Sequence, residues 1–543
     1  LPREEVAQII QVCRNFLVLF IIIFNFGIVK SELKNVSYYG GFLSWNHAKQ
    51  NKDYANLKKF LYEIDLDKID ETFYEEILFQ SVIFSDWNNS RLISEKILLK
   101  DKNNVIANFY MMVDQFLESG SSQNYLGNIE LKEFDSNFIR AINIWLSYKD
   151  KSEINIESEC IPIICLHTAL FYKNKKNEEK SDKYFEKIEV ENFASFRLKE
   201  ILLLNAIDKK NHNEALKKNE ELKKLKINFQ NYDINYLKNN KSLFNPIYSQ
   251  SDGIAEVLYN ISSWYYSKDI NMYAAFFGKL SIRLRTDFNA MRLLLSGILN
   301  DLELDNLALM NLNSVDEKNI YFYKIFKMRL AFLEKLEKNN IFIDELKKFT
   351  NRFPSEFEMR RILGDKYRKL KNYEKAIVVY SRLIENDKLE GTSNILYSRG
   401  ISYEQIKDWN RAEQDFKRSL DLNPNDPYVM NYLAYSWLDR KININKALEL
   451  LKKAVELEPS DGYIRDSLGW AYFLSKEFEE SVFHLEKAVV MLPNDATLND
   501  HLGDAYWMSN RKSEALSQWK KVLILDPEYK TKKVVNEKIN KGL

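Results

Sequence analysis

Residues 462–527 read GYIRDSLGWAYFLSKEFEESVFHLEKAVVMLP followed by NDATLNDHLGDAYWMSNRKSEALSQWKKVLILDP. Small, large and turn-forming residues of the first segment recur at the same spacing in the second. The matching pairs are Leu468 and Leu502, Gly469 and Gly503, Tyr472 and Tyr506, Ser481 and Ala515, Leu485 and Trp519, and Pro493 and Pro527. Each pair is 34 residues apart, so the chain contains an internal repeat of that length.

Two further prolines, Pro424 and Pro459, extend the repeat upstream with gaps of 35 and 34 residues. A period of 34 residues is that of the tetratricopeptide (TPR) unit, a hairpin of two antiparallel helices. Two helices that cross closely need a small residue on each at the crossing, with large residues around it. The proline cannot continue a helix and therefore begins the next unit. We predict an all-α TPR helix-turn-helix solenoid, wound as a right-handed superhelix.

The same spacing predicts three regions after residue 35. Residues 36–250 read as divergent TPR-like helical repeats, in which DYANLKKFLYEI (53–64) and DWNNSRLISEKIL (86–98) look like second helices. Residues 251–527 form a regular array of about eight units, and 528–543 a C-terminal capping helix that covers the exposed end of the stack. The loop-like stretch 239–253 is the expected boundary between the two halves.

Composition excludes several classes of protein. Hydrophobic residues make up 45% and charged residues 29% of the 543-residue chain, as in ordinary globular proteins. The net charge of +1 provides no general field for nucleic acid, so we expect no nucleic-acid partner. Nine prolines and fifteen glycines over this length favour helices joined by short turns.

Residues 16–29, FLVLFIIIFNFGIV, are too short to span a bilayer comfortably, since a helix needs about 20 residues. Their length matches the apolar core of a secretory signal, of about 7–15 residues. We predict that residues 1–31 are a signal peptide, cleaved after Ser31, or a membrane anchor, and that the protein lies on the periplasmic side of the cell envelope. The alternatives are a buried first helix and a cytoplasmic protein.

The chain shows no arrangement typical of catalysis. Three cysteines, Cys13, Cys160 and Cys165, argue against a disulfide framework. Cys160, Cys165 and His167 lack a fourth metal ligand, and the stretch after Pro162 reads as a buried apolar helix, so we expect no metal site.

The five histidines lie outside metal motifs, and neither a G-x-S-x-G string nor a P-loop occurs. His484 is expected on the outer surface and His501 on the lip of the concave face, where no nucleophile is spaced to it. We therefore predict a protein that is not an enzyme and holds no cofactor.

A ligand of such a solenoid would contact positions 2, 5, 9, 12 and 13 of each first helix, which line the concave face. Here these positions are aromatic and acidic, which suits a groove for a client peptide or helix, with the acids favouring a basic one. For Trp470 and Phe473, packing against the neighbouring hairpin is an equal alternative. The predicted partner-binding residues are Tyr397, Glu404, Tyr428, Asn431, Tyr435, Asp439, Tyr463, Asp466, Trp470, Phe473, Asp500, Asp504 and Trp507.

The C-terminal region resembles the envelope TPR proteins of alphaproteobacteria. The strings that carry the resemblance are YSRGISYEQIKDWNRAEQDF (397–416), NYLAYSWLDR (431–440), DGYIRDSLGWAYF (461–473) and NDHLGDAYWMSNRKSEALSQWKKVL (499–523). The chain is more distantly similar to the outer-membrane lipoprotein adaptor of carboxyl-terminal processing proteases. That adaptor is anchored through a lipidated cysteine, and no cysteine follows residues 16–29 closely here.

The residues and the resemblance together predict a non-catalytic scaffold or adaptor in the bacterial cell envelope, which binds a client protein in its concave groove. An envelope protease or assembly complex is one kind of partner that the resemblance implies. An accessory component of such a machine, with its site in the N-terminal half, is the alternative function.

Overall fold

The computed structural model of the chain divides into two compact units, Leu1–Lys338 and Asn339–Leu543. Each unit is built from helices, and no strand occurs in the part of the chain that the structure describes. The described residues are 38–51, 53–61, 63–66, 69–120, 126, 133–147, 160–188, 196–224, 238–240, 246–313, 315, 319–385, 391–526 and 532–543.

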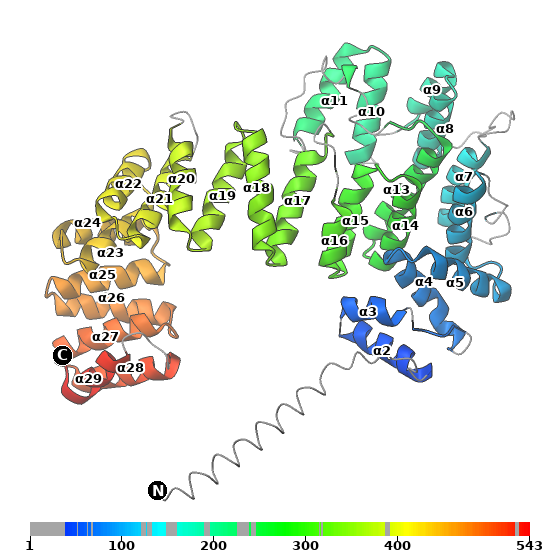
Figure 1. Cartoon of the computed structure of the whole chain (residues 1–543). Coiled ribbons are helices and arrows are strands. Elements are labelled where there is room, and N and C mark those ends of the chain that lie inside the picture. Colours follow the sequence, from blue (N-terminus) through cyan, green and yellow to red (C-terminus); the bar gives the residue numbers. More distant parts are fainter. Residues whose placement is uncertain are drawn as a thin grey trace, which may run out of the picture. The chain divides into compact units, whose positions relative to one another are not determined.

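The first unit runs from blue to green in Figure 1 and consists of helices, among them antiparallel pairs joined by short turns such as α8–α9 and α13–α14. Its helices are α2 (Tyr38–Gln50), α3 (Tyr54–Leu61), α4 (Tyr74–Ile83), α5 (Trp87–Lys100), α6 (Val105–Ser119), α7 (Glu133–Leu146), α8 (Pro162–Asn174), α9 (Glu178–Phe185), α10 (Phe196–Asp208), α11 (His212–Lys224), α13 (Gln250–Tyr266), α14 (Asn271–Leu284), α15 (Asn289–Asp301), α16 (Asp305–Asn311) and α17 (Phe322–Lys335). The helices expected after the turns near residues 53 and 86 are present as α3 and α5.

The second unit begins at α18 (Asn339–Arg352) and continues as five regular hairpins and a terminal helix. The hairpins are α19–α20 (Phe357–Lys369, Tyr373–Ile384), α21–α22 (Thr392–Gln405, Trp409–Leu422), α23–α24 (Pro427–Asp439, Ile444–Leu457), α25–α26 (Gly462–Leu474, Phe478–Met491) and α27–α28 (Ala496–Met508, Lys512–Leu525). The terminal helix is α29 (Lys532–Lys541), which packs against α28 as a cap.

Each regular hairpin is held by the predicted close crossing of its two helices. A methyl group added to Gly469 of α25 would lie 2.6 Å from Cγ of Leu485 on α26. At Gly503 of α27 the added atom would lie 2.5 Å from the Trp519 ring of α28. Both distances are too short for real carbon atoms, so the helices approach at a spacing that only glycine allows. The large residue facing each glycine is fully buried in return.

The turn inside each regular hairpin contains a residue with a left-handed backbone. In four of the five hairpins it lies five positions before the small residue of the second helix, and in α23–α24 Lys441 lies six positions before Ala447. Lys476 (φ 64°) precedes Ser481 by five positions, and Asn510 (φ 62°) precedes Ala515 by the same number. The same turn recurs in the first unit, where Lys176 and Lys210 stand 34 residues apart. The divergent half therefore uses the backbone turn of the regular array, although its glycine and proline markers are missing.

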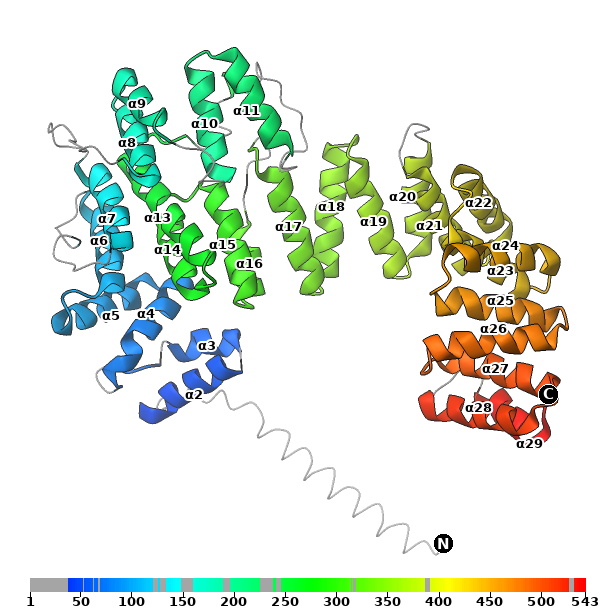
Figure 2. The ribbon, with the colours of Figure 1, turned by 180° about the vertical axis from the view of Figure 1, so that it is seen from behind.

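The first unit continues past the predicted boundary near residue 250. Gly253, on α13, packs directly against the Trp145 ring of α7. The hydroxyl of Tyr273 on α14 donates to Glu75 on α4 at 3.0 Å, across 198 residues of sequence. Figures 1 and 2 both show α14 beside α4. The long-range contacts thus join helices before and after residue 250 within the first compact unit, which ends at Lys338.

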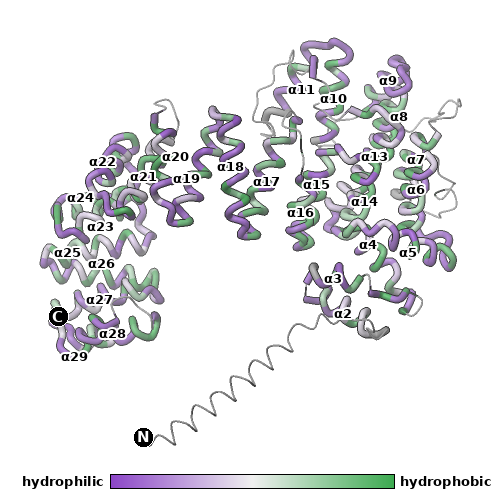
Figure 3. The backbone as a smooth tube through the Cα atoms, viewed as in Figure 1, coloured by the Kyte–Doolittle hydropathy of each residue, from purple (hydrophilic) through white to green (hydrophobic). Residues whose placement is uncertain are grey.

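Apolar and polar residues alternate along the helices of both units, as the mixed colours in Figure 3 show. None of the described helices combines the length and the apolar character that crossing a membrane requires. The predicted signal or anchor at residues 1–31 lies outside the described residues.

The close crossing can be tested by Gly469→Ala, which should lower the free energy of unfolding by about 1–2 kcal/mol. Overpacking against Leu485 costs about 1–3 kcal/mol, and alanine returns up to about 1 kcal/mol of helix propensity. Urea unfolding followed by circular dichroism measures the change. Gly297→Ala is the matched control, because its nearest neighbour, the Tyr266 hydroxyl, lies at 3.7 Å. Equal stability of the two variants would show that the crossing does not require glycine.

Candidate functional site

Three tyrosines at predicted inner-face positions are exposed on the first helices of two consecutive hairpins. Tyr428 and Tyr435 on α23 are 52% and 38% exposed, and Tyr463 on α25 is 55% exposed. The two helices pack against each other, and residues seven apart lie on one face of a helix. We call these three residues the tyrosine strip. These are the predicted aromatic residues that are exposed to solvent.

Trp470 and Phe473 form a stack with a histidine of the next repeat. The Trp470 ring lies 4.7 Å from Phe473 and 4.2 Å from His501, nearly parallel to both. Nδ1 of His501 is 3.0 Å from the carboxylate of Asp466. Both Asp466 and His501 are buried, so the prediction that His501 lies on the surface is wrong. The imidazole is enclosed because its partners come from the preceding hairpin.

Charge interactions raise the pKa of His501 above its usual value. Burial by itself lowers this pKa, but the adjacent Asp466 carboxylate outweighs it, with help from Asp500 and Asp504. The ring therefore carries its proton in the folded protein at pH values where a free imidazole has lost it. The pair is an internal contact between α25 and α27.

The acids of the last repeat are paired with the terminal helix. Nζ of Lys538 on α29 lies 2.8 Å from Asp500 and 2.6 Å from Asp504. Asp504 also accepts a hydrogen bond from the Trp519 indole at 2.9 Å. The capping helix thus supplies the basic group that the sequence analysis assigned to a client. These two carboxylates stabilise the end of the stack.

The C-terminus also contacts Trp507. A carbon atom added to Gly542 would lie 2.0 Å from the Trp507 ring, so the chain after α29 runs against this indole. The ring also packs on Trp519, with centroids 5.5 Å apart. Trp507 is partly buried by these contacts.

Of the remaining predicted residues, some contact other side chains of the chain and others are exposed. The Tyr397 ring packs edge-on against Tyr432 at 5.7 Å and is partly buried. Glu404 accepts a hydrogen bond from Ser436 at 2.8 Å and lies 3.1 Å from the Arg440 guanidinium.

Asn431 and Asp439 lie beside the tyrosine strip on α23. The side-chain oxygen of Asn431 is buried and accepts no hydrogen bond from a described residue. The side chain of Asp439 is 71% exposed, with the Arg440 guanidinium 4.0 Å away. Asp439 is therefore the predicted acid that remains most open to a ligand.

The cysteines and the remaining histidines form internal contacts. Cys160 is joined to Cys165 by a local disulfide, which the odd number and the spacing of the cysteines did not predict. His167, on the predicted buried helix, contacts the Trp145 indole at 3.1 Å and the Asn260 amide at 3.2 Å. Burial lowers the pKa of His167 to about 3, so the ring is neutral.

His484 is half-buried rather than on the outer surface, with its ring stacked on Tyr472 at 5.4 Å. Burial lowers the pKa of His484 to about 4. Among the described residues, no group of three or more His, Cys, Asp or Glu side chains is arranged to hold a metal ion.

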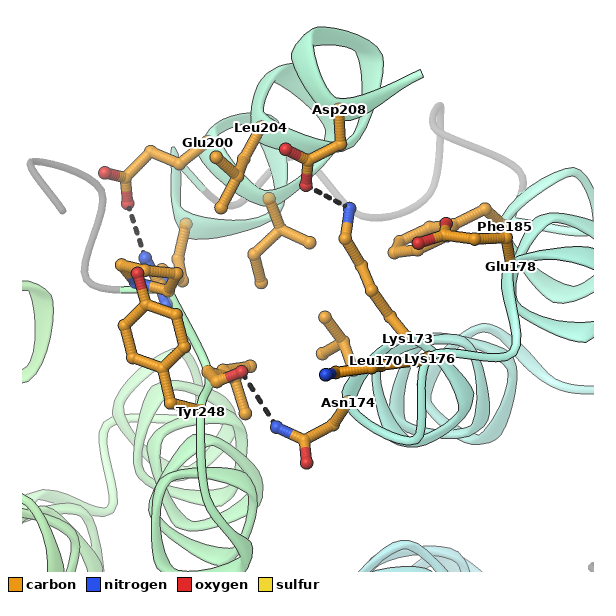
Figure 4. Close-up of a pocket in the computed structure, with 14 residues that line it drawn as sticks. Leu170, Lys173, Asn174, Lys176, Glu178, Phe185, Glu200, Leu204, Asp208 and Tyr248 are labelled. Carbon is orange, nitrogen blue, oxygen red and sulfur yellow. Dashed lines mark hydrogen bonds and ion pairs between the residues drawn. The ribbon is translucent and has the colours of Figure 1, made fainter. Parts of the chain in front are cut away.

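The first unit contains a cavity of about 660 Å³ that no sequence pattern predicts (Figure 4). It lies between α8, α10 and the segment before α13, with apolar walls that include Leu170 and Leu204. Lys173 and Asp208 form an ion pair of 2.7 Å across it, and Asn174 donates to the Ile247 carbonyl at 3.1 Å. No motif in the sequence marks these residues, because they come together only through the packing of three segments.

One end of the cavity borders a buried charge network. Arg197 pairs with Glu256 at 3.0 Å and lies 3.4 Å from Glu200, which also accepts a hydrogen bond from the Tyr321 hydroxyl. Burial raises the pKa of Glu200 to about 7, although Arg197 opposes the change. The contacts join α10 to α13 and to the segment before α17. The network therefore holds the unit together around the cavity.

The raised pKa of His501 predicts a pH-dependent contribution to stability. The pKa is about 6.5 in the unfolded chain and higher in the folded one. The Asp466–His501 pair therefore stabilises the fold fully below about pH 6.5, and this stabilisation is lost as the pH rises through the folded-state pKa. Hydrogen–deuterium exchange of α25 and α27 should show that His501→Gln loosens them more at pH 6 than at pH 9. An effect of the same size at both pH values would contradict the charged pair.

Comparison with known proteins connects this geometry to a repeat family. A tetratricopeptide-repeat model matches residues 393–426, which cover most of α21 and α22. No curated protein matches the chain.

The chain is similar to solved structures of MamA, among them residues 41 to the end of MamA from Desulfovibrio magneticus RS-1. That match has 23% identity and a TM-score of 0.29, and covers 32% of this chain and 96% of the other. A double mutant of MamA RS-1 gives 23% identity, a TM-score of 0.29 and coverages of 32% and 95%. With the hairpins and turns described above, the repeat match identifies the chain as an all-α solenoid of tetratricopeptide-type hairpins with a divergent helical N-terminal half.

Proposed function

We propose that the protein is a non-catalytic scaffold or adaptor that holds a segment of a client protein against the tyrosine strip. The observation that carries this proposal is the exposure of Tyr428, Tyr435 and Tyr463 on packed first helices. Large aromatic side chains are anchors at protein interfaces because they provide much contact area with few rotatable bonds. A row of them on a stable surface favours a binding role.

The hairpins behind the strip make it a rigid surface. Leu433 and Ala434 of α23 and Leu468 of α25 are buried in one apolar cluster. Because this cluster fixes the helices, the tyrosines are presented in a defined arrangement before a ligand arrives. Preorganisation of this kind lowers the entropy cost of binding.

The acidic residues near the strip indicate which side chains a client segment should carry. Asp466, Asp500 and Asp504 have partners within the chain, whereas Asp439 is open to solvent beside Tyr435. We therefore propose a client segment recognised chiefly by apolar or aromatic side chains, with a lysine or arginine near Asp439. A uniformly basic client would meet few available acids.

The cell envelope is the proposed location. Residues 16–29 have the length and apolar character of a signal core, and the resemblance of residues 393–527 to envelope proteins agrees with it. The cavity between α8 and α10 favours a second candidate function, in which the first unit binds a small ligand as part of a larger assembly.

The tyrosine strip can be tested by peptide display on the immobilised full-length chain. Selected peptides should be rich in apolar and aromatic residues, and Tyr428→Ala with Tyr463→Ala should weaken their binding by about tenfold or more, because interface anchors of this type contribute about 2 kcal/mol each. Fluorescence anisotropy measures the dissociation constants. Phe483→Ala is the matched control, since this aromatic residue is 49% exposed on the second helix α26 and lies outside the strip. Unchanged affinity of the double variant would exclude the strip as the binding site.

The location can be tested with a reporter enzyme that is active only outside the cytoplasm, fused after residue 40. We expect reporter activity, because the apolar segment at 16–29 would direct export. A fusion in which that segment is deleted should be inactive. A second fusion after residue 40 carries a reporter that is active only in the cytoplasm. Activity of this second reporter alone would refute the envelope assignment.

A further inference from the structure

On a second surface of the C-terminal unit, several basic side chains lie close together without acidic partners. A groove of about 370 Å³ lies over α19 between α18 and α20. Four cations line it: Lys347, Arg360, Lys375 and Arg382. We call it the basic groove. It is formed largely by second helices, whereas the tyrosine strip lies on first helices.

The four cations have no carboxylate partner within ion-pair distance among the described residues. Glu374 is the one acid among the described residues that line the groove. The amino groups of Lys347 and Lys375 lie 5.9 and 5.8 Å from the centre of the Tyr367 ring. Like charges gathered in this way repel one another, and an anionic ligand would relieve that repulsion.

The next hairpin shows the contrasting arrangement. Arg399 pairs with Asp415 at 2.7 Å, and Lys417 pairs with Glu413 at 2.9 Å. The excess of cations in the basic groove therefore does not continue as a stripe into this hairpin. A nucleic acid needs such a stripe to contact successive phosphates, so a short ligand fits the observations better.

The floor of the groove is apolar. Leu363 and Val379 line it, and Val378 at its edge is 52% exposed. A small inorganic anion would leave this apolar surface uncovered. A peptide with carboxylates and an apolar side chain would use both features, because arginine binds carboxylates through two parallel hydrogen bonds.

We propose that the basic groove docks a short acidic segment of a partner protein, with its carboxylates at Arg360 and Arg382 and an apolar side chain against Val378. Lys347 and Lys375 hold the flanking carboxylates. This interaction is independent of the tyrosine strip and provides the solenoid with a second binding surface of different chemistry.

The test is a titration of the full-length chain into a short fluorescein-labelled peptide of alternating glutamate and leucine. We expect saturable binding by fluorescence anisotropy that weakens as salt is raised, since salt screens exposed charges. A peptide of alternating lysine and leucine should not bind. Absence of saturable binding, or equal binding of the lysine peptide, overturns the proposal.

Variants assign the binding to the groove. Arg360→Gln with Arg382→Gln should weaken binding of the acidic peptide by about tenfold, as loss of complementary charges does at other interfaces. Lys348→Gln is the matched control: this lysine is also on α18, but it is 76% exposed, pairs with Asp344 and does not line the groove. If the arginine variant misfolds by circular dichroism, Lys347→Gln with Lys375→Gln provides the same test at two exposed positions. Undiminished binding by a folded variant overturns the proposal.

Competitors distinguish the class of ligand. Inorganic phosphate and a single-stranded oligonucleotide should displace the acidic peptide only weakly. Displacement by phosphate at millimolar concentration would show a general anion site, and tighter binding of the oligonucleotide would show a nucleic-acid site; either result overturns the docking of an acidic segment. Tyr428→Ala with Tyr463→Ala should leave binding of the acidic peptide unchanged. The proposal for the basic groove and the proposal for the tyrosine strip can therefore be refuted separately.

Discussion

The close approach of two helix backbones within each hairpin determines how the rest of this molecule is arranged. Where Gly469 faces Leu485 and Gly503 faces Trp519, even one added carbon atom would collide. That spacing allows the large partner to fill the crossing completely, which buries apolar surface worth about 25 cal/mol per Å². Four of the five regular hairpins meet this constraint with a glycine, and α23 has the small Ala434 at the same position, so equivalent positions of successive first helices lie in rows. The tyrosine strip exists because of this repetition.

The turn that joins the helices shows how far the repeat could be predicted. Recurring glycine, alanine and proline revealed the regular units, since each residue type has a steric reason to be there. In the divergent half the turn is made by Lys176 and Lys210, with φ near 60°. Lysine is not a residue that marks a left-handed backbone, because its side chain makes that conformation unfavourable. The regular units also place lysine at this turn, as at Lys476, so in both halves the packing of the flanking helices determines the turn. The sequence reveals the turn only where the glycine and proline markers accompany it.

The candidate site could also be predicted only in part. The positions of its residues follow from the repeat, but their partners within the chain do not. The register correctly places acids and aromatic residues on the first helices, and three tyrosines are exposed there. It does not show that His501 reaches Asp466 from 35 residues away, or that Lys538 reaches Asp500 from 38 residues away. An acid on the inner face of a stack lies beside the next repeat, and a buried carboxylate without a partner is costly. Such acids therefore acquire partners within the chain before they can serve a ligand, which sequence spacing does not reveal.

The chain has almost equal numbers of basic and acidic residues, so cations that lack an acidic partner need an explanation. With 79 basic and 78 acidic residues, the chain has enough of each sign to pair its charges locally, as α21 and α22 do. Cations left together in the basic groove therefore reflect the placement of residues and not an excess in composition. The tyrosines of the strip are exposed, although large rings such as Trp519 and Phe416 are buried in the core of the same unit. Their exposure therefore also reflects where the residues are placed. The basic groove lies on α18, α19 and α20 and the tyrosine strip on α23 and α25, so one array of hairpins provides two surfaces with different chemistry.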